Sequence, residues 1–334
     1  MDINNRRHLH AVAKDRLQNA PSAPKIALIY GGIVVGSSLL STTVSYLLGM
    51  QISQLEGLRS IQMRSILSTI QTILPILVNF LLMALELGFA NTMLRVSRRQ
   101  FTSPQGLRMG FSRFWLLLRA ALVQGAMYFG AALVSFYVAM QIYLFTHMSR
   151  KLTDLLAPML ASPTLDPSAL LEDPAITAGV YSAMLPMFII MLIVLAAISL
   201  PISYYYRMTD YVIIDKPQST ALGALRESRR MMRRHCMSMF RLDLALWWYY
   251  LAMALSAVLC YGDILLSLFG VTLPFSPDVS YFLFLGLYLL ACLAVIFFLR
   301  PRVEVAYALA YDSLRPADPP AQSGGAVLGN IFNM

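Results

Sequence analysis

Apolar residues are concentrated in six long stretches, and shorter segments that carry most of the charged residues separate these stretches. A helix rises about 1.5 Å per residue, so roughly 20 apolar residues cross the hydrocarbon core of a bilayer. The pattern therefore predicts an all-α, polytopic membrane protein with about six transmembrane helices. We place these helices at residues 26–50, 66–94, 114–145, 180–206, 240–268 and 281–299.

The segments on either side of this region differ from it in composition. Residues 1–25 are predicted to form a mobile, basic, cytoplasmic arm, and residues 26–314 the six-helix transmembrane domain. Residues 315–334 are rich in Pro and Gly and cannot bury a core, which predicts a disordered cytoplasmic tail. The first apolar stretch exceeds the h-region of a signal peptide, about 7–15 residues, so we expect it to be a retained helix.

Prolines indicate where these helices should bend or end. Pro75 lies inside the second predicted helix and lacks a backbone N–H, so a kink is expected near the outer end of that helix. Four prolines between residues 157 and 175 are incompatible with one long helix there. The sixth helix is expected to continue past Arg300 to Leu314.

Composition supports the membrane interpretation. Apolar residues make up 58% of the chain, charged residues 13%, and the mean hydropathy is +0.63. Soluble domains carry about 25% charged residues, so this chain has too few charges to cover a water-facing surface. The composition excludes a soluble globular protein.

The distribution of basic residues predicts the orientation. With six alternating helices, 22 of the 26 Lys and Arg residues fall on one side, and the other side receives Arg59, Arg64, Arg150 and Lys151. Basic residues accumulate in cytoplasmic loops, so we expect both termini in the cytoplasm of a bacterium and the helices in its cell membrane. The same rule accounts for the net charge of +9 without a nucleic-acid partner.

A cytoplasmic amphipathic helix is predicted between the fourth and fifth spans. From Ser219 onward, helical spacing places one stripe on a single face: Ala221, Leu225, Ser228, Met232, Cys236 and Met239. Five arginines occupy the remaining faces: Arg226, Arg229, Arg230, Arg233 and Arg234. Such a helix would lie in the membrane interface, with anionic lipid headgroups as its partner. The alternative is that these arginines only keep the loop inside.

A second group of candidates consists of ionisable residues close to the apolar stretches. Glu86, Arg300 and Glu304 are the leading ones, because charges at membrane depth often mark functional pathways. Counted along their helices, both glutamates fall near the cytoplasmic boundary. This position favours an interfacial carboxylate paired with a neighbouring Arg over a proton relay. Arg119, Asp243 and Asp312 are further residues of this kind.

The sequence contains no recognised catalytic or metal-binding motif. A zinc protease needs two His residues four apart with a Glu between them, and the four histidines lack that spacing. Cys260-Tyr-Gly-Asp263 lacks the first Gly of the Gly-x-Gly-Asp motif of intramembrane aspartyl proteases. The three cysteines form no CxxC pair. We therefore expect no cofactor and no metal.

A weak internal repeat is visible at the helix exits. The second, fourth and sixth spans each leave the membrane through an extension with Tyr or Arg, and a short amphipathic stretch follows the first two. Those stretches are Ser103-Pro-Gln-Gly-Leu-Arg-Met-Gly-Phe111 and Ser219-Thr-Ala-Leu-Gly-Ala-Leu-Arg226. Three related helical hairpins would explain the pattern, as would chance similarity among apolar sequences.

Residues in the second half of the chain resemble a known family. The segments are Leu222-Gly-Ala-Leu-Arg-Glu-Ser-Arg-Arg-Met-Met232, Met239-Phe-Arg-Leu-Asp-Leu244 with Trp247-Trp248, and Ala306-Tyr307 with Ala310-Tyr-Asp312. They are similar to the bacterial integral membrane proteins called domain of unknown function 975, over about residues 85–314. The chain departs from the family pattern at Arg233-Arg234, where a Gly is expected, and at Pro301-Arg302, where a Pro-Tyr pair is expected. The resemblance implies a membrane protein and no biochemistry.

The sequence favours a non-enzymatic membrane scaffold or accessory protein that contacts anionic lipid or another membrane protein. The alternative is a small permease, which would need a polar cavity near the midplane, usually at broken helices. An intramembrane enzyme is the third hypothesis.

Overall fold

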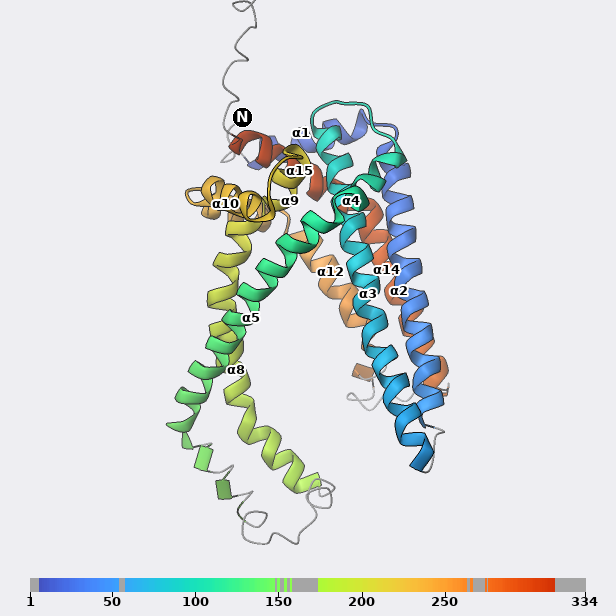
Figure 1. Ribbon diagram of the computed structural model, residues 1–334, viewed down its shortest axis with the longest axis vertical. Coiled ribbons are helices and arrows are strands. Elements are labelled where there is room, and N and C mark those ends of the chain that lie inside the picture. Colours follow the sequence, from blue (N-terminus) through green and yellow to red (C-terminus); the bar gives the residue numbers. More distant parts are fainter. Residues whose placement is uncertain are drawn as a thin grey trace, which may run out of the picture. The chain divides into compact units, whose positions relative to one another are not determined.

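The structure, a computed structural model, describes residues 6–53, 58–147, 149–150, 153–154, 157, 174–262, 265–266, 274 and 276–315. Every regular element in these ranges is helical (Figure 1). Five helices are long and apolar enough to cross a membrane, and one bent pair of helices would be a sixth span. The prediction of an all-α protein with about six membrane-spanning segments is confirmed.

The chain divides into two compact units. Residues 1–113 and 238–334 form one, which we call the terminal unit, and residues 114–237 form the other, the central unit. In α8 of the central unit, only 6% of the most apolar window is buried inside the protein. An apolar surface that its own unit leaves uncovered is what a membrane-spanning helix presents to lipid.

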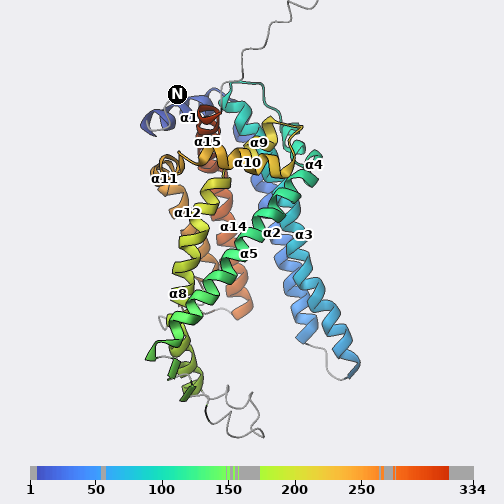
Figure 2. The same ribbon diagram turned by 60° about the vertical axis from the view of Figure 1, so that its left-hand side comes forward.

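The terminal unit contains two helical hairpins. In the first, α2 (Ala23–Ser53) packs along α3 (Leu58–Ser97), and in the second, α12 (Trp247–Cys260) packs along α14 (Pro277–Phe298). Helix α14 also packs against α2, which joins the two hairpins. Two further helices, α1 (Arg6–Gln18) and α15 (Arg300–Leu314), lie together at one end of these spans, as Figures 1 and 2 show.

The central unit is a third hairpin with a helical extension. Helix α5 (Phe114–Leu144) packs along α8 (Pro174–Tyr206), where the Tyr143 hydroxyl donates to the Ala183 carbonyl at 3.0 Å. The chain continues through α9 (Thr209–Asp215) into α10 (Ala221–Met232). Consecutive spans are thus paired as the repeat hypothesis expects, although its evolutionary part stays a prediction.

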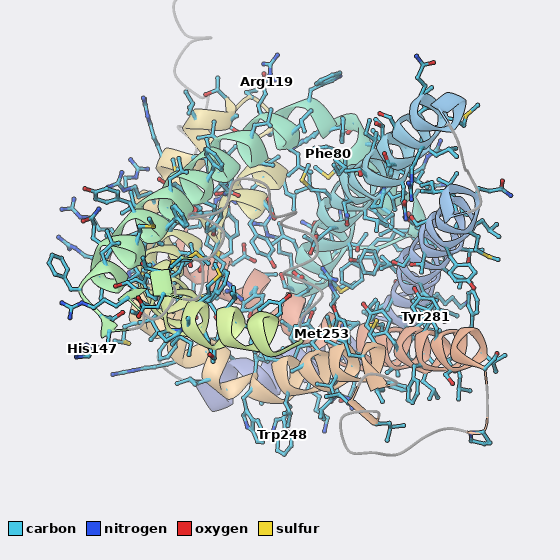
Figure 3. The ribbon with its side chains drawn as sticks, turned by 90° about the horizontal axis from the view of Figure 1, so that it is seen from below. Phe80, Arg119, His147, Trp248, Met253 and Tyr281 are labelled. Atoms are coloured by element: carbon cyan, nitrogen blue, oxygen red, sulfur yellow. The ribbon has the colours of Figure 1, made fainter. Side chains whose placement is uncertain are left out.

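The predicted fifth span is wrong as a single helix. It is broken into α11 (Cys236–Ala245) and α12, which meet at a bend of 64°. At the break, Leu246 is buried, whereas Trp248 is 63% exposed and points away from the ribbon (Figure 3). Asp243, one turn earlier, is also buried and accepts a hydrogen bond from Tyr307 of α15. These contacts hold the end of α11 against α15, which hydropathy along the chain does not reveal.

The basic N-terminal arm also differs from the prediction. Instead of a mobile segment, residues 6–18 form α1, whose Leu9 and Ala13 are buried. Helix α1 packs against α15 and α3, so its apolar positions serve as a docking face. The predicted tail beyond residue 315 and most of the Pro-rich segment at 157–175 lie outside the described residues.

Among the described helices of the terminal unit, α15 is the most deeply buried. All residues from Val305 to Tyr311 are buried, and α1, α3 and α14 pack around them. Beyond this stretch, Asp312 accepts hydrogen bonds from the Arg98 guanidinium on both carboxylate oxygens, with Nη2 at 2.6 Å from Oδ1. Bidentate pairs of this kind fix orientation as well as charge, so the exit of α3 is joined to the end of α15.

A short segment after α3 folds back onto that helix. It consists of the 3₁₀ helix η1 (Pro104–Arg108) and α4 (Met109–Ser112). A Cβ atom on Gly110 would overlap the Ala84 carbonyl, and one on Gly88 would overlap the Leu107 carbonyl. Glycine on both sides therefore allows the two backbones to touch.

Candidate functional site

The candidate site begins with the way α10 is held in the central unit. Thr220 caps the helix, because its Oγ1 accepts a hydrogen bond from the Gly223 N–H at 3.1 Å. Ser228 Oγ accepts from the Met208 N–H at 3.2 Å and donates to the Tyr205 carbonyl at 3.0 Å. Both backbone groups lie at the junction of α8 and α9, so Ser228 fixes α10 to that junction.

The apolar stripe of α10 is present, but it faces protein. Ala221, Leu225, Ser228 and Met232 are buried, and α10 packs against α5, α8 and α9. The expectation that this face lies in the lipid interface is therefore wrong. The reason is that an amphipathic pattern specifies one apolar face and does not specify what covers it.

The amphipathic helix is also shorter than predicted. Helix α10 ends at Met232. A turn follows that contains Arg233, Arg234 and His235, and a new helix begins at Cys236. Met239, the last member of the stripe, is buried on that second helix. A periodic stripe can be shared by two helices because each keeps its own apolar face inward.

Four of the five predicted arginines surround one pocket of the central unit. Arg226, Arg229, Arg230 and Arg233 line it together with Tyr205, and its volume is about 490 Å³. We call it the arginine pocket. All four arginines are exposed, and the Arg229 guanidinium carbon lies 6.0 Å from the Tyr205 ring centroid. Arg234 is exposed but does not line the pocket.

The charged residues that line the arginine pocket are all positive. Its lining residues include no carboxylate, and Glu227, the acidic residue of α10, is paired with Lys216 at 2.5 Å. Four guanidinium groups around one opening present many N–H donors to an anion. The arrangement suits the recognition of phosphate or carboxylate groups.

The three boundary candidates come together in the terminal unit. Arg300 Nη2 donates to Glu86 Oε1, and Arg300 Nε lies 3.9 Å from Glu304 Oε1. The guanidinium carbon of Arg300 also lies 5.0 Å from the Tyr30 ring centroid. Burial lowers the pKa of Arg300, but nearby acidic groups, Tyr30 and Glu86 first, outweigh burial and raise it. Two carboxylates around one permanent cation form a clamp between α3 and α15.

The terminal unit also contains a buried polar chain that local sequence patterns did not indicate. The Tyr307 hydroxyl donates to Asp243 Oδ1 at 2.6 Å and lies 2.8 Å from the Tyr250 hydroxyl. Asp243 is 8% exposed and Tyr307 is 7% exposed. The sequence signal was an Asp beside an apolar stretch, but nothing local identified a tyrosine 64 residues away as its partner.

Comparison with known families decides the classification. A sequence model of the family "Protein of unknown function (DUF975)" matches residues 1–318. The chain belongs to the DUF975 family. No curated protein and no solved structure matches it.

The residues that carried the resemblance to DUF975 hold the helices together. Ser228 joins α10 to the α8–α9 junction, Asp243 and Tyr307 join α11 to α15, and Asp312 binds Arg98. Arg233 and Arg234, where this DUF975 protein departs from the expected Gly, form the turn after α10. The recognisable residues thus include structural contacts, and the first of the three segments also contains Arg226, Arg229 and Arg230 of the arginine pocket.

Groups of three or more potential metal ligands are absent from the part of the chain that the structure describes. The side chains of His8 and His10 lie outside the described residues. Cys236 and Cys260 are partly buried, and Cys292 is buried.

Proposed function

We propose that this DUF975 protein is a non-enzymatic scaffold or accessory protein of the bacterial cell membrane, with both termini in the cytoplasm. It would bind anionic lipid headgroups through the arginine pocket. The observation that carries this proposal is the convergence of four exposed arginines and Tyr205 on one opening of about 490 Å³. The 22-to-4 division of basic residues supports the cytoplasmic side for this pocket.

Headgroup binding fits the chemistry of the pocket. A lipid phosphate carries one negative charge and several acceptor oxygens, which guanidinium groups bind in pairs. Each basic residue near an anionic leaflet contributes about 1 kcal/mol, so the four arginines supply a sizeable attraction. Because α10 is fixed by Ser228 and its packing, three of the arginines are presented by an anchored helix, and Arg233 by the turn that follows it.

The test compares the parent with a variant in which Arg229, Arg230 and Arg233 are replaced by Gln. Phosphatidylglycerol should copurify with the parent and raise its melting temperature in nanodiscs above that in pure phosphatidylcholine. The variant should lose roughly 3 kcal/mol of lipid attraction. The parent's gain should also shrink with salt, since exposed charges are screened within about 8 Å at physiological ionic strength.

A matched control replaces Arg95, Arg108 and Arg119 by Gln. These arginines are exposed and lie outside the arginine pocket, so the change in net charge is the same. The control should keep the response to phosphatidylglycerol. If phosphatidylglycerol stabilises the parent and both variants equally, the arginines only set topology. If both variants lose this stabilisation equally, it comes from the general surface charge and not from the arginine pocket.

A small permease is the second candidate, and one groove favours it. The groove has a volume of about 670 Å³ in the terminal unit, between α2, α3 and the start of α14. Hydroxyls of Ser41, Ser45 and Tyr281 line it, together with Gln71 and Pro75. Pro75 lacks an N–H, which removes the helical donor of the Gln71 carbonyl. A hydroxyl-lined groove beside such a residue suits a neutral polar solute.

Thiol labelling tests whether this groove holds water. With the three native cysteines replaced by Ser, a hydrophilic maleimide should label Ser41→Cys, which lines the groove. It should not label Leu40→Cys, whose side chain is 67% exposed to the lipid-facing surface. Equal labelling rates at both positions would count against the permease.

A further inference from the structure

A second polar pocket lies in the terminal unit, apart from the arginine pocket and its lipid-binding role. Its volume is about 500 Å³, and three segments form it: the end of α1, the turn into α2, and the residues after α3. We call it the α1–α3 pocket. Its polar lining consists of Asp15, Arg16, Asn19, Ser22, Arg99, Gln100 and Thr102.

Specific contacts hold the two sides of the α1–α3 pocket. Ser22 Oγ and Thr102 Oγ1 share a hydrogen bond of 2.5 Å across 80 residues of sequence, and Thr102 is buried. Arg99 adopts a left-handed backbone conformation with φ of 56°, which turns the chain at the end of α3. The Gln100 N–H then donates to the Arg95 carbonyl at 2.9 Å. The pocket is thus built by a defined turn.

The charge of the pocket is positive. Arg16 and Arg99 outnumber Asp15, whose carboxylate already accepts a hydrogen bond from Asn19 at 3.0 Å and lies 3.7 Å from Arg99 Nη2. Ser22 immediately precedes the first residue of α2, so the positive N-terminal end of that long helix lies at the edge of the pocket.

Arg16 supplies the observation that points to a ligand. Its Nε is buried and meets no hydrogen-bond acceptor among the described residues. Buried donors in proteins are nearly always satisfied, and the Nε–H of a partly buried arginine that meets no acceptor in the protein suits an oxyanion. We infer that the α1–α3 pocket binds a phosphoryl group, held by Arg16 and Arg99 with donors from Asn19, Gln100 and the hydroxyl pair.

A phosphoryl group can come from a soluble phosphate or from a lipid headgroup. Both offer the same acceptor oxygens to the two guanidinium groups. The neighbouring Phe101 side chain is 88% exposed and Val96 is buried, so one wall of the pocket is apolar. That wall would cover the organic part of a phosphate ester.

The experiment titrates inorganic phosphate into the purified full-length protein in a nonionic detergent, with KCl adjusted to hold the ionic strength constant. Melting temperature and calorimetry should show saturable binding to the parent. Arg16→Gln should weaken binding by about tenfold or more, as expected for losing a hydrogen bond between charged groups. Arg95→Gln removes the same charge from outside the pocket and should bind phosphate like the parent.

Two further variants protect the test against a folding defect. Arg99→Asn keeps a residue that tolerates the left-handed conformation and should also weaken phosphate binding. Asp15→Asn removes the negative charge and should tighten it several-fold. Absence of saturable binding to the parent, or unchanged binding by Arg16→Gln, would overturn the inference.

Lipid arms identify the source of the phosphoryl group and separate this site from the proposed function. If only phosphatidylglycerol nanodiscs stabilise the parent, and Arg16→Gln removes that gain, the ligand is a headgroup. The Arg229, Arg230 and Arg233 triple variant should keep its phosphate binding. If the triple variant loses it while Arg16→Gln keeps it, the phosphate binds in the arginine pocket and the inference fails.

Discussion

The segments that follow α3 and α8 perform the same task with different chemistry. After α3, η1 and α4 fold back onto their own hairpin through backbone contact, because Gly88 and Gly110 leave no side chain between the chains. After α8 and α9, α10 folds back through a side chain, because Ser228 binds two backbone groups of the α8–α9 junction. The η1–α4 segment therefore depends on two glycines that have no side chain, and α10 depends on the hydroxyl group of Ser228.

This difference has a consequence for what each segment can display. The η1–α4 segment is so close to α3 that its backbone is the contact, and it is only nine residues long. Helix α10 is held at one face by Ser228, which leaves the rest of its circumference for arginines. Anchoring through the Ser228 hydroxyl therefore leaves room for a longer and more highly charged helix in α10 than the glycine contact leaves in the η1–α4 segment.

The largest expected effect comes from filling the glycine contact. Gly110→Ala would place a methyl group against the Ala84 carbonyl, and a backbone atom cannot move aside as a flexible side chain can. Overpacking of this kind costs about 3 kcal/mol, so the melting temperature in detergent should fall by several degrees. Gly125→Ala in α5 is the control, because its Cβ would meet nothing within 4 Å. An unchanged melting temperature for Gly110→Ala would show that Gly110 and the Ala84 carbonyl are not in close contact.

An intermediate effect is expected from removing the hydroxyl anchor. Ser228→Ala leaves the buried Met208 N–H without its partner, which costs about 1–3 kcal/mol. The same substitution at Ser182 removes only a hydrogen bond within its own helix and should cost less. Thermal unfolding of both variants measures the difference. If the two variants melt together, Ser228 is not the anchor of α10.

The smallest effect is expected at the start of α10. Thr220→Ala removes the side-chain cap from the Gly223 N–H and should cost about 1 kcal/mol. Thr220→Ser keeps the hydroxyl and should retain the parent melting temperature. Hydrogen exchange should localise the loss to the first turn of α10. Uniform exchange across the central unit would instead indicate that α10 and the hairpin unfold as one.

Long, uninterrupted apolar runs made much of this fold predictable. The third span was predicted at residues 114–145 and the helix runs from Phe114 to Leu144, because nothing within the run competes with a helix. The apolar stripe of α10 was predicted from its helical spacing, but the protein elements that cover it were not.

The remaining features depend on contacts between residues distant in sequence. The break at Leu246 accompanies the hydrogen bond from Tyr307 to Asp243, and α1 forms a helix with a covered face because α15 is there to cover it. For the candidate sites, residue type identified Glu86 and Arg300, but only the fold joins them across 214 residues. The sequence did not indicate the α1–α3 pocket, because its polar lining residues come from two distant segments and form no recognisable motif.

Helix α15 also sets an order of events during synthesis. Leu9 of α1 is translated nearly three hundred residues before α15, one of the two helices that α1 packs against, so α1 leaves the ribosome long before α15 exists. The hairpins of α2 with α3 and of α5 with α8 have neighbouring partners and can pair as they emerge. A nascent chain stopped before Arg300 would therefore hold paired spans beside an α1 that has α3 but lacks α15 to cover it. Such a chain would display the apolar face that cellular quality control recognises.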